Sequence, residues 1–247
     1  MSKKVCLFVL ILFSLSFVLI SQEAEDVFAK GDALCDEMSD METAQNVLKI
    51  YEEALNAEEN KYEAYWRIAR ILYYIGDHTE KKKEKKAIFE RGVYNATKAV
   101  ALETERPEGH YWLGVSNGMV GDVKGVLKSL SLVKPIKESM NKVIELDRSY
   151  GEGGADRVLG RVYFKLPGFA GGDNDKSLEH LMKSLEYGPE DAVTHLYLAD
   201  TYLALKDKVK AKAELEFVLN MEDDPRWTSD IASCKKDAQA LLDKKFK

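Results

Sequence analysis

Apolar and polar residues follow one another along this chain with a helical period, and one pattern recurs five times. Each copy has a small or medium-sized residue followed directly by a larger apolar one, and in most copies another large apolar residue stands three positions earlier. Residues at this spacing share one face of an α-helix, so each copy predicts an amphipathic helix. The five copies centre on Ala54-Leu55, Ala99-Val100, Val143-Ile144, Ser184-Leu185 and Val218-Leu219.

A second set of helices is marked by a large residue followed by a small one. From a copy of the first pattern to the next small residue the step is 15 residues three times (54 to 69, 99 to 114 and 184 to 199) and 17 once (143 to 160). A small residue at a fixed position lets two helices pack closely, so the two patterns together predict helix pairs. The second pattern occurs at Leu34-Cys35, Ile68-Ala69, Leu113-Gly114, Leu159-Gly160 and Leu198-Ala199.

This large-small-large spacing resembles the tetratricopeptide repeat, or TPR. The resemblance is strongest where His195, Leu198, Ala199 and Tyr202 precede Ala211, Leu215 and Val218. Only the last of the anchor-to-anchor distances, 45, 44, 41 and 34 residues, equals the standard period, so the middle copies carry insertions. The sequence predicts an all-α, TPR-like solenoid of about five helix pairs, capped by a C-terminal helix between Trp227 and Phe246.

The N-terminus has the layout of a secretory signal peptide. Lys3 and Lys4 precede an apolar run from Val5 to Ile20, and polar residues follow. As a helix this run spans about 24 Å, short of the bilayer core of about 30 Å, which favours a cleaved signal over a retained anchor. We expect residues 1–21 to be the signal and residues 22–247 a single domain that is exported to the periplasm. A lipoprotein needs its cysteine at the end of the apolar run, and Cys6 sits at the start, so a lipid anchor is not supported.

Composition narrows the function classes. With 45% hydrophobic and 32% charged residues, the chain is typical of a folded domain. The formal charge of −6 becomes −8 without Lys3 and Lys4, because residues 1–21 contain no acids, and this disfavours nucleic acid as a partner. Cys35 and Cys234 remain after cleavage; a disulfide is possible, but Cys35 stands at a small packing position, which favours a buried thiol.

No catalytic or metal-binding pattern stands out. The histidines are scattered, and His110 and His195 occupy a packing position of the repeat. The glycine-rich segments lack the residues of a phosphate-binding loop. Asp173-Asn174-Asp175 begins like a calcium loop but lacks its glycine and distal glutamate, so we expect Asp173 to cap a helix. The sequence therefore predicts no enzyme, no cofactor and no metal.

The repeat template places one face of each first helix on the concave surface. The candidate groove residues for a ligand or partner are Trp66, Arg70, Tyr73, Tyr111, Arg157, Arg161 and Phe164. The remaining positions of the template are Glu63, Tyr74, Glu108, Val115, Met119, Lys165, Val193, Leu196, Asp200 and Leu203. Arginine pairs with carboxylates and aromatic rings add apolar area, which suits an amphipathic organic acid or an acidic peptide. Alternatively, Arg157 and Arg161 pair with Asp156 or Glu152, and the rings pack between repeats.

Several short motifs between Pro107 and Pro225 resemble the T component of TRAP transporters, the periplasmic TPR family called TatT. They are Pro107-Glu108-Gly109 with Trp112-Leu113-Gly114, Ile136-Lys137, Ile144-Glu145-Leu146-Asp147, Gly153-Gly154-Ala155-Asp156-Arg157, Leu159-Gly160-Arg161, Leu166-Pro167-Gly168, Gly171-Gly172 and Lys176-Ser177. The resemblance implies a homotrimer, a ligand-lined cavity in each subunit, and association with the substrate-binding P component of an organic acid transporter. The alternative is a general periplasmic TPR scaffold that docks a peptide or protein partner in its groove.

Overall fold

The computed structural model describes residues 27–35, 38, 40–222 and 228–246. The predicted signal peptide lies outside the described residues. Within the described part, the regular secondary structure is helical and contains no β-strand, which confirms the all-α prediction. None of the described helices is long and apolar enough to cross a membrane.

The helices come in successive pairs, as the sequence patterns predict. Residues 27–35 are helical and pack against α2 (Met41–Ala54). The next pairs are α3 (Lys61–Asp77) with α4 (Lys82–Leu102), α5 (Pro107–Lys124) with α6 (Leu130–Asp147), α7 (Tyr150–Lys165) with α8 (Asn174–Leu185), and α9 (Ala192–Ala204) with α10 (Lys208–Asn220). The last helix, α11 (Thr228–Lys245), packs on α10 and α9. Short 3-10 turns η1 (Glu58–Asn60), η2 (Val126–Lys128) and η3 (Gly168–Ala170) precede α3, α6 and α8.

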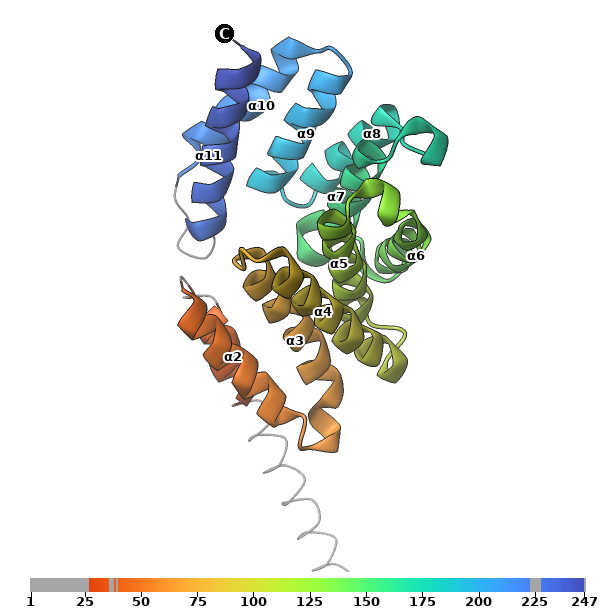
Figure 1. Cartoon of the computed structure of the whole chain (residues 1–247), viewed down its shortest axis with the longest axis vertical. Coiled ribbons are helices and arrows are strands. Elements are labelled where there is room, and N and C mark those ends of the chain that lie inside the picture. Colours follow the sequence, from red (N-terminus) through yellow and green to blue (C-terminus); the bar gives the residue numbers. More distant parts are fainter. Residues whose placement is uncertain (1–26, 36–37, 39, 223–227, 247) are drawn as a thin grey trace, which may run out of the picture.

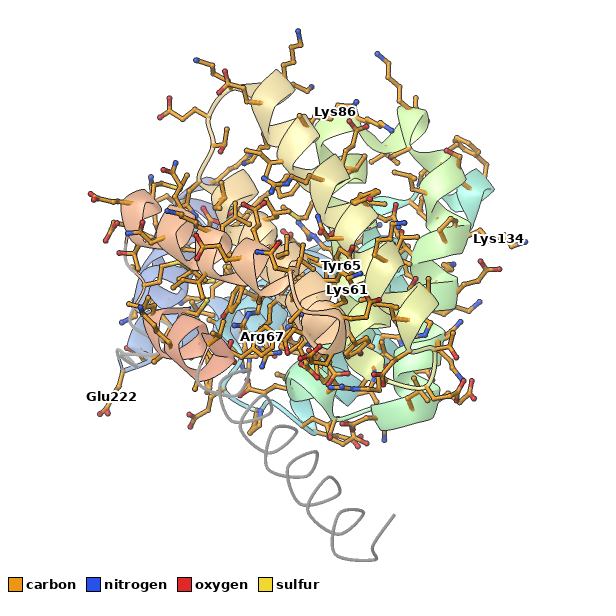
Figure 2. The ribbon with its side chains drawn as sticks, turned by 90° about the horizontal axis from the view of Figure 1, so that it is seen from below. Lys61, Tyr65, Arg67, Lys86, Lys134 and Glu222 are labelled. Carbon is orange, nitrogen blue, oxygen red and sulfur yellow. The ribbon has the colours of Figure 1, made fainter. Side chains whose placement is uncertain are left out.

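The first helices of the pairs form the inner layer of a curved solenoid. Helix α3 contacts α5, α5 contacts α7, and α7 contacts α9. Figure 1 shows α3, α5, α7 and α9 following one another around the bend, with α11 and α2 on the same side of the molecule. Figure 2 shows the molecule from below with its side chains, and Lys134 and Glu222 project from opposite edges. The inner helices therefore turn one face each toward a common interior.

Small residues set how closely the paired helices pack. A Cβ atom at Gly114 would lie 2.1 Å from Cε of Met140 on α6, and a Cβ at Gly160 would lie 2.6 Å from Cγ of Leu181 on α8. Met140 and Leu181 are fully buried, so neither has room to withdraw. These two glycines occupy the small position of the repeat template, and this explains why the sequence pattern located the pairs correctly.

Aspartate side chains cap the N-termini of four helices. Asp40, Asp173, Asp191 and Asp207 accept hydrogen bonds from backbone N–H groups at the starts of α2, α8, α9 and α10. This confirms Asp173 as a helix cap. In the basic stretch of residues 81–86, Lys81 precedes α4 and the other residues begin it, with residues 81–84 exposed. Pro107 begins α5.

Helix α7 starts with an irregular turn. Gly151, Glu152 and Gly153 all have left-handed backbones, with φ of 60°, 56° and 72°, so regular helical geometry begins at Gly154. A left-handed backbone is unstrained in glycine and uncommon in glutamate. A Cβ at Gly153 would lie 2.9 Å from the Cα of Ser184, which excludes any larger residue there. This turn sets the direction in which α7 leaves α6.

Candidate binding cavity

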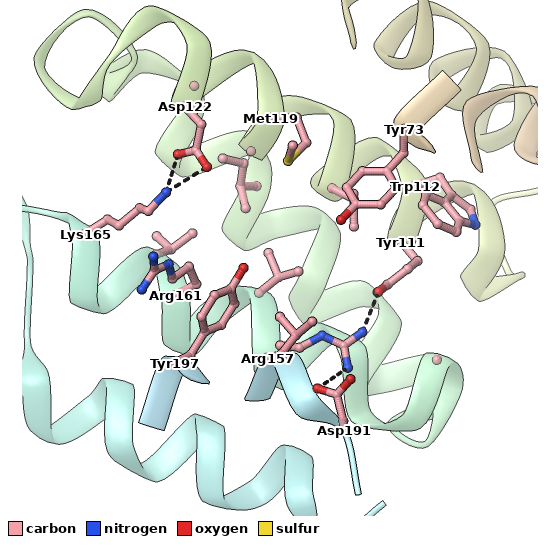
Figure 3. A pocket seen from close by; sticks show the side chains of 18 of the residues that line it. Tyr73, Tyr111, Trp112, Met119, Asp122, Arg157, Arg161, Lys165, Asp191 and Tyr197 are labelled. Carbon is pink, nitrogen blue, oxygen red and sulfur yellow. Dashed lines mark hydrogen bonds and ion pairs between the residues drawn. The ribbon is translucent and has the colours of Figure 1, made fainter. Parts of the chain in front are cut away.

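The inner helices enclose a cavity of about 650 Å³. Its walls come from α3, α5, α7 and α9, from η2 and the N-terminal half of α6, and from Ile231 of α11. The lining is predominantly apolar, with a few charged side chains among the rings and aliphatic groups. Side chains from four successive helix pairs and the cap helix therefore share one hollow, which Figure 3 shows from close by.

Most of the predicted groove residues lie on this hollow. The structure brings together Trp66, Arg70 and Tyr73 from α3, Tyr111 from α5, and Arg157 and Arg161 from α7. Phe164 does not line the cavity. Its ring lies 5.1 Å below the guanidinium of Arg161, at the edge of the inward stripe of α7. Of the remaining template positions, Val115, Met119, Lys165 and Val193 line the cavity.

Other lining residues were not predicted from the sequence. The turn η2 contributes Val126 and the first turn of α6 contributes Val133. The apolar character of residues 123–134 is the only sequence signal that this segment packs on something. Tyr150 and Glu152 reach the wall because the left-handed turn places them there. Ile231 comes from α11, whose docking depends on the curvature of the whole solenoid.

One end of the cavity is aromatic. The rings of Tyr111 and Trp112 meet edge to face with centroids 5.2 Å apart, and Tyr111 meets Tyr150 in the same way, also at 5.2 Å. Tyr73 lies across from Trp112 at 6.0 Å. Edge-to-face contacts of this kind hold rings in fixed orientations. Figure 3 shows Tyr73, Tyr111 and Trp112 grouped on one side of the hollow, so this end offers a rigid apolar surface.

Arg157 joins α7 to the turn before α9. Its Nη1 lies 3.0 Å from Oδ2 of Asp191, and its Nη2 donates a hydrogen bond of 3.2 Å to the hydroxyl of Tyr111. Burial alone lowers the pKa of Arg157, but Tyr111 and Asp191 outweigh it and raise that pKa, so the guanidinium stays charged. The alternative that Arg157 and Arg161 pair with Asp156 or Glu152 is wrong. Asp156 instead pairs with Arg148 and His180 on the outer side of α7.

Arg161 packs against two aromatic rings. Its guanidinium is 4.2 Å from the centroid of Tyr197 and 5.1 Å from that of Phe164, and its Nη1 donates a hydrogen bond of 2.7 Å to Asp200. Its Nε is buried and finds no hydrogen-bond partner in the described part of the chain. Burial raises the pKa of the Tyr197 hydroxyl, although Arg161 and Arg157 oppose that rise, so Tyr197 stays neutral. Arg161 therefore keeps unused hydrogen-bonding capacity beside the cavity.

The other cations of the wall are also paired. Nζ of Lys165 lies 2.7 Å from both carboxylate oxygens of Asp122, across from α7 to α5. Arg70 donates hydrogen bonds to Asp32 at 2.5 Å and to the hydroxyl of Tyr51 at 3.1 Å. Each positive side chain on the wall thus has an internal carboxylate, which limits how strongly the empty cavity attracts an anion.

The two cysteines of the described part of the chain pack against neighbouring side chains, and no metal site is found there. Cys35 and Cys234 are free thiols, and Cys35 is half-buried rather than buried as expected. Sγ of Cys35 lies 3.8 Å from the hydroxyl of Tyr51, and burial raises the pKa of its thiol, so it is a poor nucleophile. Cys234 is buried in the apolar cluster where α11 meets α9 and α10. Among the described residues, no group of three or more histidine, cysteine or acidic side chains is arranged to hold a metal ion.

Paired helices, small residues at the close contacts and a shared concave hollow define a TPR-type α-solenoid. Solved structures agree. The TPR protein TTC0263 of Thermus thermophilus is similar at 16% sequence identity and a TM-score of 0.66, over 88% of this chain and 100% of that one. MamA protein is similar at 16% identity and a TM-score of 0.50, over 91% of this chain and 94% of that one. At this identity the likeness shows the fold.

A family model described as Regulator of microtubule dynamics protein 1-3 matches residues 27–166, which is more than half of the chain. The chain belongs to this family. No curated protein sequence matches it.

Proposed function

We propose that this chain is a non-enzymatic TPR-type binding protein that receives part of another molecule in its cavity. The observation that carries this proposal is the convergence of four inner helices and Ile231 on one hollow of about 650 Å³. That volume lies within the range of about 300 to 1,000 Å³ typical of ligand sites. Solenoids of this kind use their concave surface for binding.

Our first candidate guest is a short, mostly apolar segment of a partner protein that carries an acidic group. Rings at one end of the cavity supply rigid apolar area, and arginine supplies a carboxylate-binding fork. A segment bound in this way contacts several helix pairs at once, because the wall is built from all of them. This is the scaffold function that the TPR fold favours.

A second candidate follows from the partial closure of the hollow. Residues of η2, α6 and α11 cover what would otherwise be an open trough, so its volume suits a free organic acid. In that case the protein is a periplasmic accessory of a TRAP-type uptake system, as the TatT resemblance implies. The substrate-binding P component is then its partner, and the protein forms a homotrimer.

Gly118 offers a direct test of the cavity. It lies on the wall in the middle of α5, and a Cβ atom there would have no neighbour within 4 Å. The Gly118→Phe substitution therefore starts from an unobstructed Cβ and directs a ring into the hollow, and helix propensity favours phenylalanine over glycine. Gly168 is the matched control, since it also has open space around a Cβ and does not line the cavity.

Two probes distinguish the candidates: decanoate, and the peptide acetyl-Leu-Ala-Leu-Phe with a free carboxyl terminus. Binding is measured by isothermal titration, and native mass spectrometry of the purified protein reports the oligomeric state and any retained ligand. We expect the wild type and Gly168→Phe to bind a probe, and Gly118→Phe to lose binding while remaining folded. The proposal is wrong if Gly118→Phe binds as well as the wild type, or if neither probe binds the wild type.

A further inference from the structure

We infer that Arg161 is the residue that recognises a carboxylate on the guest. The inference rests on the proposed function, because it assumes that a guest occupies the cavity. The carboxylate belongs either to a free organic acid or to the end of a peptide, and the chemistry at Arg161 is the same in both cases. Three observations support this choice: the state of the other cations, the geometry of Arg161, and its place in the cavity.

Each of the other cations of the wall makes two polar contacts within the protein. Arg157 uses both terminal nitrogens, one on Asp191 and one on Tyr111. Lys165 is shared between the two oxygens of Asp122. Arg70 donates to both Asp32 and Tyr51 through Nη2, and its Nε is buried without a partner in the described part of the chain, like that of Arg161. A guest that drew any of these away would break an internal ion pair, and this opposes binding.

Arg161 differs because it makes one such contact where each of the others makes two. A guanidinium has five N–H donors, and in the described part of the chain that of Arg161 makes a single hydrogen bond, to Asp200. Its Nε is buried without a partner, which is unfavourable in the empty cavity. The rings of Tyr197 and Phe164 both lie against the guanidinium, so its orientation is restricted before a guest arrives. A planar, partly satisfied guanidinium is suited to a carboxylate.

The position of Arg161 also gives the guest a direction. Figure 3 shows Arg161 with Lys165 and Asp122 at one side of the hollow and Tyr73, Tyr111 and Trp112 at the other. A carboxylate at Arg161 therefore leaves its apolar body on the aromatic rings. The two cations at this end are balanced by Asp122 and Asp200, so a second carboxylate that does not reach the free donors of Arg161 finds no uncompensated cation there. The preferred guest carries one carboxylate.

The test compares each acid with its neutral counterpart. The probe pairs are decanoate with decanol, and acetyl-Leu-Ala-Leu-Phe with its C-terminal amide. Titrations use the wild type, Arg161→Gln, Arg161→Lys and the control Arg91→Gln, since Arg91 lies on α4 and does not line the cavity. A hydrogen bond to a charged group corresponds to about a 10- to 100-fold change in affinity. We expect the wild type and Arg91→Gln to prefer the acid by that factor.

We expect Arg161→Gln to lose the preference for the acid and to bind the neutral probe as the wild type does. We expect Arg161→Lys to keep part of the preference, because lysine keeps the positive charge but lacks the paired donors of the guanidinium. If the wild type binds acid and neutral probe equally, the inference is wrong, whether or not Arg161→Gln folds. It is also wrong if Arg161→Gln weakens both probes to the same extent. In either case, sensitivity of the neutral probe to Gly118→Phe shows that the cavity still binds a guest, so the proposed function stands.

Discussion

Asp156 is the buried charge on which the placement of α7 depends. Its side chain is fully buried and accepts hydrogen bonds of 2.8 and 3.1 Å from Arg148, in the turn before α7, and one of 2.8 Å from Nδ1 of His180 on α8. Arg157 and Arg161 follow on the same helix, so Asp156 helps to orient both of them. We predict that Asp156→Ala destabilises the protein strongly.

The structure sets the size of the effect. Breaking a buried ion pair costs about 3 to 5 kcal/mol. The side chain of Arg148 is 36% exposed and regains water when Asp156 is removed, which places the loss near the lower limit, at about 3 kcal/mol. For a chain of this size, that loss lowers the melting temperature by about 6 to 12 °C. Asp243→Ala on α11 is the control, because its exposed side chain predicts a change within about 0.5 kcal/mol.

The effect also depends on pH in a defined direction. Burial alone raises the pKa of Asp156, but the hydrogen bonds from His180 and Arg148 outweigh it and hold that pKa below its ordinary value. A lowered pKa stabilises the folded state above the unfolded pKa of about 3.9, and this stabilisation is lost as the pH falls through the folded pKa. Urea unfolding followed by circular dichroism should show the full difference at about pH 7 and a smaller one below about pH 4. A loss under about 1 kcal/mol at neutral pH would refute the reasoning.

Three further changes test the fold, each by urea unfolding. Gly160→Val should lower the free energy of unfolding by about 2 kcal/mol through overpacking against Leu181. If Leu181→Ala, added to Gly160→Val, restores none of this stability, the contact does not limit the packing. Asp173→Ala should cost about 1 kcal/mol because α8 loses its cap, and an unchanged midpoint would contradict this. Burial lowers the pKa of His195, but Glu214, 2.6 Å away, reverses this and raises it. The resulting stabilisation is present below about pH 6.5 and is lost as the pH rises through the folded pKa of His195. Glu214→Gln should therefore destabilise the protein more at about pH 6 than at about pH 9. Equal losses at the two pH values would argue against this role of Glu214.

The helix pairs were predictable because their signals are local. Gly114 and Gly160 face Met140 and Leu181 across a single hairpin, and the spacing of these residues is visible in the sequence. The inward face of α7 followed from the same period, which is why Arg157 and Arg161 were placed on the hollow. Phe164 lies too far round the helix, and it packs under Arg161 instead.

The contacts between neighbouring pairs could not be predicted in this way. Arg157 finds Asp191 in the turn of the next pair, and Arg161 finds Asp200 on α9. Both contacts depend on how far one pair rotates relative to the next, and the sequence period does not fix that angle. Ile231 reaches the cavity for the same reason, since the accumulated curvature decides where α11 packs.

The central claim is that a guest binds among the inner helices. Methionine methyl NMR tests it most directly, because Met119 lines the cavity while Met182 lies on α8, outside it and 48% exposed. Titration with decanoate or the free-acid peptide should shift the methyl resonance of Met119 and leave that of Met182 unchanged. A saturable shift of Met182 with no change at Met119 would place the guest elsewhere and contradict the account.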